Sequence, residues 1–294
     1  MRILVTGAGG MLGRDIVEVL TGHPEHTVTA VTRTQLDLTD TAAVNDAVAG
    51  HDVVLNAAAW TDVDRAEQDE TAATVVNGTA VTQLAGACAT HRAHLLHVST
   101  DYVFAGDADT PYREDSPTTP INAYGRSKLV GEQAVRRLLP DTGHVVRTAW
   151  LYGAHGRNFV TTMVDLADQR EFLDVVDDQQ GQPTWSYALA RRLVTLAEAA
   201  RAGRAPAGIW HGTCSGQTTW YGLARAVFAL RGLDPDRVRP TTSSRFPRPA
   251  PRPAYSVLGH GRWAEAGLSP LPDWHTTLVE AFTSAAPPSP WKVA

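Results

Sequence analysis

The first 20 residues constrain the fold more than any other stretch of the chain. A short apolar run, Arg2–Thr6, precedes the glycine-rich turn Gly7–Gly13, and an amphipathic segment, Arg14–Leu20, follows it. This order of strand, glycine-rich turn and helix is typical of the first unit of a dinucleotide-binding sheet. Glycines let such a turn approach a pyrophosphate, whose charge is stabilised at a helix N-terminus. An ordinary tight turn is the alternative. The residues expected at the cofactor are Gly7, Gly10, Met11 and Leu12.

Further apolar runs alternate with helical segments along the chain. They are predicted to be buried strands because they are rich in β-branched residues and are bounded by turn-forming residues. These strands are Thr27–Thr32, Asp52–Asn56, His94–Ser99 and Gly143–Thr148. Phe172–Val176 is a candidate sixth strand, and Ser186–Arg201 has the pattern of an amphipathic helix. Alternating strands and helices favour an α/β fold, a doubly wound parallel sheet of the Rossmann type.

The ends of the second and third predicted strands provide further candidate cofactor contacts. NAD binding favours an acidic residue after the second strand, but Thr32 and Arg33 stand there. Arg33 could pair with a 2′-phosphate, so NADPH is predicted and NADH is the alternative. Asp37 and Leu38 are candidate walls of an adenine pocket, although Asp37 or Asp40 could instead cap the next helix. The small residues that would allow close approach of the cofactor are Ala57, Ala58 and Ala59.

The stretch Pro120–Lys128 contains a candidate catalytic pair. Only two of the 26 Lys and Arg residues are lysines, and one of them, Lys128, follows Tyr124 by four residues. A helix from about Ala123 to Leu139 would put both side chains on one face. An ammonium about 4 Å from the phenol could bring the tyrosine pKa down toward neutrality, so Tyr124 could act as a general acid. The alternative is an exposed pair without a catalytic role.

Thr100 is a third candidate for the same site. It directly follows the fourth predicted strand, in Ser99–Phe104. Ligands of open parallel sheets bind outside the carboxyl ends of the strands, so Thr100 is expected on the same rim as the glycine turn and Asn56. Its hydroxyl could hydrogen-bond a substrate carbonyl, or it could simply cap a turn.

Composition excludes several classes of function. The 294 residues are 43% hydrophobic and 19% charged, as in an ordinary globular protein of one large domain or two. A net charge of −5 gives no general footprint for nucleic acid or an anionic membrane. Two cysteines make no disulfide framework, and no apolar run reaches about 18 residues, so a cytoplasmic protein is predicted. The acidic stretch Thr61–Glu70 is interpreted as a solvated face, and His91, His94 and His97 as no metal site.

The pattern of segments also predicts how the chain divides. Residues 1–150 are expected to form the dinucleotide-binding domain, with 172–205 added to it. Residues 151–171 and 206–286 are expected to form a smaller substrate-binding lobe, because Trp, Pro and Gly become frequent there. The proline-rich tail 287–294 is predicted to be disordered.

Together these motifs resemble the extended short-chain dehydrogenase/reductases and, within them, the dTDP-4-dehydrorhamnose reductase family. The resemblance extends over nearly the whole chain, and Ser99–Phe104 and the Asp-Gln-x-Gly-x-Pro-Thr segment Asp178–Thr184 are its most specific parts. It implies that NADPH or NADH delivers hydride to C4 of a nucleotide-linked 4-keto-6-deoxyhexose. In the implied triad, Tyr124 protonates the alkoxide, Thr100 hydrogen-bonds the same oxygen, and Lys128 lowers the Tyr124 pKa and holds the nicotinamide ribose.

The resemblance also implies contacts with the substrate. Asp101, Tyr102, Trp150 and Asn158 are expected at the sugar, with core packing as the alternative for Trp150, and Arg252 is expected at the diphosphate. After Arg252-Pro the family commonly has a small polar residue or Gly and then Asn or Ser. This chain has Ala-Tyr-Ser256 there, which leaves the sugar specificity open. Some members use Mg²⁺ at a subunit contact, but no ligand set for it stands out in this sequence. A homodimer is one assembly that the resemblance allows.

Three functions therefore remain to be distinguished. The leading hypothesis is reduction of dTDP-4-dehydro-L-rhamnose to dTDP-L-rhamnose. The second is another sugar-nucleotide enzyme of antibiotic biosynthesis, either a deoxysugar 4-ketoreductase or a dihydrostreptose-type synthase. The third is an NADP-binding regulatory subunit without turnover, against which the intact set of Thr100, Tyr124 and Lys128 argues.

Overall fold

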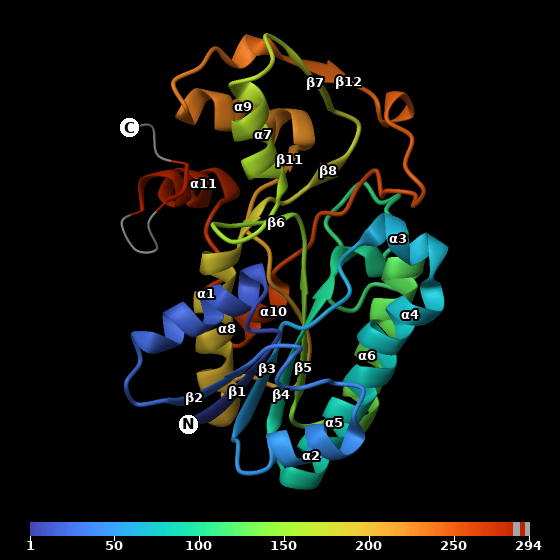
Figure 1. Ribbon diagram of the computed structural model, residues 1–294, viewed down its shortest axis with the longest axis vertical. Coiled ribbons are helices and arrows are strands. Elements are labelled where there is room, and N and C mark those ends of the chain that lie inside the picture. The colour runs from blue at the N-terminus through green and yellow to red at the C-terminus, as the bar shows by residue number, and fades with distance from the viewer. Residues whose placement is uncertain (285–288, 292–294) are drawn as a thin grey trace.

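The computed structural model of the chain describes residues 1–284 and 289–291. Its central strands are β1 (Arg2–Thr6), β2 (Thr27–Val31), β3 (Val53–Asn56), β4 (His94–Thr100), β5 (Gly143–Thr148) and β10 (Gly208–His211). They form one parallel sheet in the order β10-β5-β4-β3-β1-β2 (Figure 1). The five strands predicted up to Thr148 are all present, within two residues of the predicted bounds.

Helices cover both faces of this sheet (Figure 1). On one face lie α1 (Met11–Thr21) and α8 (Ser186–Arg201), which pack against each other. The other face is covered by α2 (Thr41–Val48), α5 (Ala80–His91) and α6 (Ala123–Leu138). Neighbouring residues of a strand point to opposite faces, so Ile3 and Val5 pack in the core with α1 and α8, whereas Leu4 packs in the core with α2 and α5. The doubly wound parallel sheet predicted from the sequence is confirmed.

The path of the chain places a ligand site at one edge of the sheet. β1 pairs with β2 on one side and with β3 on the other. The chain therefore passes to opposite faces after β1 and after β3, and their following loops diverge at the carboxyl edge. Such a switch point is where doubly wound sheets bind their ligands. The two loops are the glycine turn Gly7–Gly10 and the segment Ala57–Ala59.

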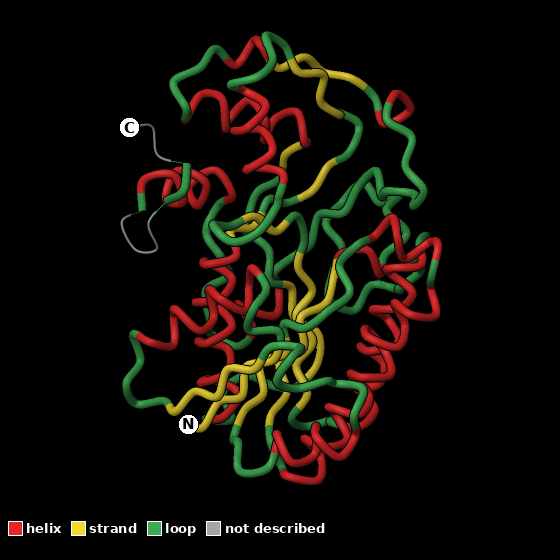
Figure 2. Tube along the Cα trace, viewed as in Figure 1, coloured by secondary structure: helices red, strands yellow, loops and turns green. Residues whose placement is uncertain are grey.

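A smaller lobe lies beyond the carboxyl edge of the sheet, at the top of Figure 1. Figure 2 shows it as helices, loops and short strands. Its helices are α7 (Phe159–Ala167), α9 (Trp220–Leu230) and α11 (Trp274–Thr283). Its paired strands are β7 (Leu173–Val176) with β12 (Val238–Thr241) and β8 (Gln180–Gly181) with β11 (Thr218–Thr219). The short pair β6 (Leu151–Tyr152) and β9 (Thr184–Trp185) lies between this lobe and the sheet domain. Short helices elsewhere are α3 (Val63–Gln68), α4 (Glu70–Thr74) and α10 (Gly261–Glu265), and Val75–Thr79 is a π-helical turn.

Three details differ from the division predicted from sequence. The sixth strand of the main sheet is Gly208–His211, which was expected in the substrate lobe. The candidate sixth strand around Phe172–Val176 instead pairs with β12 in the smaller lobe. In the predicted disordered tail, Trp291 is buried against Phe282 and Tyr152, with ring centroids 5.4 and 6.1 Å away. Residues 287–288 and 292–294 of the predicted tail lie outside the described residues.

The described residues contain no membrane-spanning candidate. None of their helices is both long enough and apolar enough to cross a bilayer.

Candidate active site

The first turn of α6 lies against the end of β4. The helix begins at Ala123 because the Asn122 side chain accepts a hydrogen bond from Gly125 N at 2.8 Å, and Glu67 accepts from Ala123 N at 2.7 Å. The Tyr124 ring meets the Tyr102 ring edge-on, with centroids 5.9 Å apart. Tyr102 itself follows β4 by two residues. The structure therefore brings the predicted catalytic tyrosine next to Thr100, as the sequence analysis expected.

The electrostatics of Tyr124 differ from the sequence expectation. Burial raises the pKa of the phenol well above its ordinary value, the nearby Asp101 carboxylate raises it further, and a hydrogen-bond interaction with Thr100 opposes both. The pKa of Tyr124 is thus shifted upward, opposite to the direction predicted for a phenol beside an ammonium. The phenol is protonated at neutral pH, which is the form that a proton donor needs.

Thr100 and Asp101 form a compact polar pair under the tyrosines. The Thr100 hydroxyl donates to Asp101 Oδ1 at 2.9 Å and accepts from Tyr102 N at 3.2 Å. It therefore caps the turn after β4, which was the alternative for this residue, while also facing Tyr124. Burial raises the pKa of Asp101 to about 6, although interactions with Ser256 and Thr100 counter the shift.

Lys128 lies one helical turn after Tyr124 and is fully buried. Its Nζ donates to Val98 O at 2.7 Å and lies 3.3 Å from His97 Nε2. Burial lowers the pKa of Lys128 to about 8, and the Glu132 carboxylate partly counters this shift. The pair predicted from sequence does share one helix face. The ammonium nevertheless donates its hydrogen bond to the backbone of β4, at Val98 O, and does not acidify the phenol.

A chain of hydrogen bonds determines which histidine nitrogen faces this lysine. Asn56 Oδ1 accepts from Thr6 Oγ1 at 2.7 Å and from Ala58 N at 3.1 Å, so the Asn56 amide nitrogen is the group 2.9 Å from His97 Nδ1. His97 Nδ1 must therefore accept, and in neutral His97 the proton is on Nε2, facing Lys128. A proton on Nε2 that faces Lys128 disfavours the charged form of the lysine, in keeping with the lowered pKa of Lys128. Burial and Lys128 both hold the His97 pKa well below its usual value, in agreement with a neutral ring.

The lowered pKa of Lys128 predicts that this residue makes a pH-dependent contribution to the stability of the fold. The pKa of Lys128 is lower in the folded state than in the unfolded chain, so the unfolded state binds more protons between pH 8 and pH 10.5. Stability from this group therefore rises with pH across that window, by at most about 1.4 kcal/mol per pH unit. Lys128→Met should remove the rise. Urea unfolding at pH 7.5 and 9.5 measures the free energy of unfolding of the wild type and of the variant. If the difference between the two proteins were the same at both pH values, the lowered pKa of Lys128 would be contradicted. Comparing the two proteins cancels the buried tyrosines and cysteines, which titrate in the opposite sense.

A cavity of about 460 Å³ lies at the switch point of the sheet. Eight of the predicted cofactor residues line it, namely Gly7, Gly10, Arg33, Asp37, Leu38, Ala57, Ala58 and Ala59. Met11, Leu12 and Lys128, which were also predicted at the cofactor, are not among its lining residues. Leu12 points into the core, because the second residue of α1 faces the sheet. Met11 lies near Gly153.

The backbone around this cavity fits a dinucleotide. Gly7 has φ of +72°, and a side chain there would place its first carbon 2.5 Å from Ala58 N. A side chain on Gly13 would overlap the Gly7 carbonyl oxygen. Both glycines are therefore required for the turn to close over the start of α1, whose free N–H groups suit a pyrophosphate. Asp37 makes its bonds to Thr39, and Asp40 is the residue that caps α2.

The residues predicted at the substrate lie between the two lobes, and several have structural partners. Trp150 has φ of +46°, stacks on Trp220 with ring centroids 3.6 Å apart, and is half-buried. Asn158 caps α7, donating to Gly153 O at 2.9 Å and accepting from Thr161 N at 3.0 Å. Both side chains thus also have packing or capping roles. The backbone strain at Trp150 is typical of residues held in place for function.

Arg252 lies over the ring of Tyr102. Its guanidinium carbon is 5.9 Å from the Tyr102 ring centroid, and Nη2 donates to Asp64 at 3.1 Å. Asp64 belongs to the acidic stretch that was interpreted as a solvated face. In the structure this stretch caps helices and binds Arg252, with Asp62 and Asp69 as the N-caps of α3 and α4.

The chain matches the RmlD substrate binding domain family over residues 1–286. It belongs to this family. It is 55% identical to a dTDP-4-dehydrorhamnose reductase of Streptomyces griseus over 283 residues, 96% of this chain and 93% of that protein. A dTDP-4-keto-6-deoxy-D-glucose reductase of Streptomyces niveus is 52% identical, with 96% of each protein covered. The structure of a Bacillus anthracis dTDP-4-dehydrorhamnose reductase in complex with NADP has a TM-score of 0.88 to this chain at 34% identity, covering 94% of this chain and 96% of that one.

Three buried polar residues of this RmlD-family chain were not predicted to belong to the site. His97 was considered only as a metal ligand, yet it contacts Lys128. The parallel register pairs His97 with Asn56, so it could have indicated the hydrogen bond between these two side chains. Asn77, in the π-helical turn, binds the backbone of Trp60 and donates to Ser127 Oγ at 3.0 Å. Ser127 in turn donates to Tyr124 O. π-Helical turns often occur at functional sites, but this one has no clear sequence signature.

Glu132 is the third such residue, and it anchors α6 below Lys128. It accepts from Ser99 Oγ at 2.6 Å and from Arg147 Nη2 at 2.7 Å. Its carboxylate and the Arg147 guanidinium are almost completely buried. In this RmlD-family fold the pair therefore ties α6 to β4 and β5.

Proposed function

We propose that this protein reduces the C4 ketone of a dTDP-4-keto-6-deoxyhexose with NADPH, and that its substrate is dTDP-4-dehydro-L-rhamnose. The observation that carries the proposal is the placement of Thr100, Tyr124 and Lys128 at the carboxyl edge of the sheet, beside a cavity shaped for a dinucleotide. Strong similarity to proteins named dTDP-4-dehydrorhamnose reductase supports the choice of substrate.

Each of the three residues has a role that its environment suits. The bound nicotinamide cofactor supplies the hydride. Tyr124, kept protonated by burial, donates the proton that the new hydroxyl at C4 requires. The Thr100 hydroxyl fixes the ketone oxygen near this phenol. Lys128, buried one helical turn away, holds the cofactor ribose and replaces the lost proton of Tyr124.

Further residues around Tyr102 are proposed to bind the substrate. Arg252, which is half-buried and paired with Asp64, would bind the diphosphate. Asp101, Tyr102, Trp150 and Asn158 would line the sugar pocket. Ser256, from the segment that departs from the family pattern, interacts with Asp101 and so connects this segment to Thr100.

The test is turnover of purified protein with dTDP-4-keto sugars. We expect oxidation of NADPH that depends on dTDP-4-dehydro-L-rhamnose, with dTDP-L-rhamnose identified by NMR of the product. Absence of turnover while NADPH and the sugar nucleotide both bind would favour the regulatory subunit.

A second candidate is a deoxysugar 4-ketoreductase. It is favoured by the 52% identity to a protein named dTDP-4-keto-6-deoxy-D-glucose reductase, close to the 55% of the first relative. Turnover measured in parallel on the D-gluco and L-rhamno ketones distinguishes the two. A larger kcat/KM for the D-gluco ketone would select this candidate.

The choice of NADPH predicts the effect of one substitution in the cavity. Arg33 is exposed on the cavity wall, where it could pair with a 2′-phosphate. Charge-assisted hydrogen bonds contribute about 1.5–3 kcal/mol, so Arg33→Ala should raise the Kd of NADPH about 10- to 100-fold and leave that of NADH unchanged. Arg137→Ala, an exposed arginine outside the cavity, is the control. Equal weakening of both cofactors would contradict a 2′-phosphate contact.

Other expectations remain predictions from the family resemblance. They are a homodimer and Mg²⁺ at a subunit contact, and the cytoplasmic location remains a prediction from composition. The division into a cofactor domain and a substrate lobe is proposed with β10 moved to the cofactor domain and with β7 and β8 moved to the substrate lobe.

A further inference from the structure

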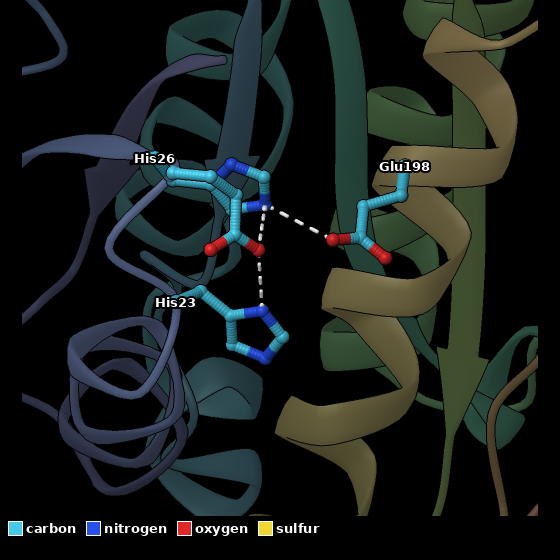
Figure 3. A group of neighbouring side chains, drawn as sticks. His23, His26 and Glu198 are labelled. Carbon is cyan, nitrogen blue, oxygen red and sulfur yellow. Dashed lines mark hydrogen bonds and ion pairs between the residues drawn. The ribbon is translucent and has the colours of Figure 1, made fainter.

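A second polar cluster lies at the far end of α1 from the glycine turn. α1 runs over 11 residues, about 16 Å, from the cavity to this end. His23, Glu25 and His26 occupy the loop between α1 and β2, and Glu198 projects from α8 toward them (Figure 3). The proposed reductase chemistry uses none of these residues.

The four side chains converge on one point. His26 Nε2 is 3.0 Å from Glu198 Oε1 and 3.9 Å from Glu25 Oε1, and His23 Nδ1 is 3.0 Å from Glu25 Oε1. The four ligand atoms all lie within 4.8 Å of one another. Two carboxylates thus face the same imidazole nitrogen, an arrangement that a cation between them would stabilise.

We propose that His23, Glu25, His26 and Glu198 bind a zinc ion. Zn²⁺ takes four nitrogen, oxygen or sulfur ligands at about 2.0–2.2 Å in a tetrahedron, which places neighbouring ligand atoms roughly 3.3–3.5 Å apart. Three of the observed separations, 3.0, 3.0 and 3.9 Å, lie on either side of that value, and all four atoms are within 4.8 Å of one another, so the side chains must close in on the ion by rotation. Two imidazoles suit zinc and disfavour Mg²⁺ and Ca²⁺, which prefer oxygen ligands alone.

Burial of one ligand supports a built site. The His26 side chain is only 6% exposed, and its ring stacks on that of His23 with centroids 5.7 Å apart. His26 Nδ1 lies 3.4 Å from the Met1 nitrogen, and His26 Nε2 is the nitrogen that faces the two carboxylates. Zinc would join the loop before β2 to α8 and thereby stabilise the cofactor domain.

Another group of possible ligands in the described residues is weaker. It comprises Asp15, Glu18 and His155 and offers three ligands. Asp15 Oδ2 already accepts a hydrogen bond from the Ser186 hydroxyl. This group provides the control for the proposed site, because it also combines carboxylates with a histidine.

The experiment uses the 294-residue chain without a histidine tag. Calorimetric titration with ZnCl₂ should give one ion per chain for the wild type. It should give none of this binding for His26→Gln or Glu198→Gln. His155→Gln should bind as the wild type does. At zinc concentrations about 100-fold above the Kd, the wild-type Tm should rise by roughly 5–10 °C and the Tm of the two site variants should not.

Substitution with Co²⁺ reports the geometry separately from affinity. The proposed site predicts the intense visible absorption of tetrahedral cobalt in the wild type, and its loss in His26→Gln. Absence of zinc binding, octahedral cobalt spectra, or loss of binding in His155→Gln instead would overturn the proposal. None of these outcomes depends on reductase activity, so the zinc site and the proposed function can fail independently.

Discussion

Replacing Tyr124 with phenylalanine should lower kcat for the proposed ketone reduction by about 10²- to 10⁴-fold, the usual contribution of a general acid. The reason is that the phenol is the protonated group next to Thr100, whose hydroxyl is proposed to hold the ketone oxygen. Cofactor binding should be unchanged, since Tyr124 is not among the residues that line the cavity at the switch point. Steady-state kinetics and NADPH titration measure the two quantities separately.

Tyr102→Phe is the matched control for this variant. Tyr102 lies edge-on to Tyr124 and is also half-buried, so the same hydroxyl deletion is made in nearly the same place. We expect less than a tenfold change in kcat for it. Full activity of Tyr124→Phe, or an equal loss in both variants, would refute the role of Tyr124 as proton donor.

Most of the fold follows from short-range patterns in the chain. β-Branched runs, glycine turns and amphipathic segments predict the first five strands and α8, because the spacing of apolar residues within a short segment indicates its secondary structure. The sixth strand was misplaced because an apolar run such as Leu173–Val176 has the same pattern in either sheet. Its partner, β12, begins more than 60 residues later, and no local signal selects that pairing over the main sheet.

The proximity of Tyr124 and Lys128 was predictable from the sequence, but the electrostatics of the two side chains were not. Helical spacing alone places Tyr124 and Lys128 on one face, and the structure agrees. The direction of the Lys128 ammonium depends on Val98 and His97, about 30 residues earlier in the chain. The pKa of Tyr124 depends on burial by groups from β4 and on Asp101. Such environments arise only when distant segments pack together, and spacing along a helix does not contain them.

The buried pair Glu132–Arg147 should have the largest effect on stability. Glu132→Ala leaves the Arg147 guanidinium and the Ser99 hydroxyl without their partner in an interior where both side chains are at most 3% exposed. Breaking such a pair from one side costs about 3–5 kcal/mol of unfolding free energy. Urea unfolding measures the loss.

Two comparisons separate the burial effect from the loss of charge. Glu70, in α4, forms an exposed ion pair with Arg126 of α6 at 2.7 Å. Glu70→Ala removes the acid of this pair and should lower the unfolding free energy by less than about 1 kcal/mol. The double variant Glu132→Met, Arg147→Met should recover much of the stability, because an apolar pair of similar volume leaves no buried charge unpaired. Since Glu132 also holds α6 to β4 below Lys128, the double variant should lose kcat even where its stability is restored. If its activity were restored as well, the pair would only stabilise the fold and would not position the catalytic helix.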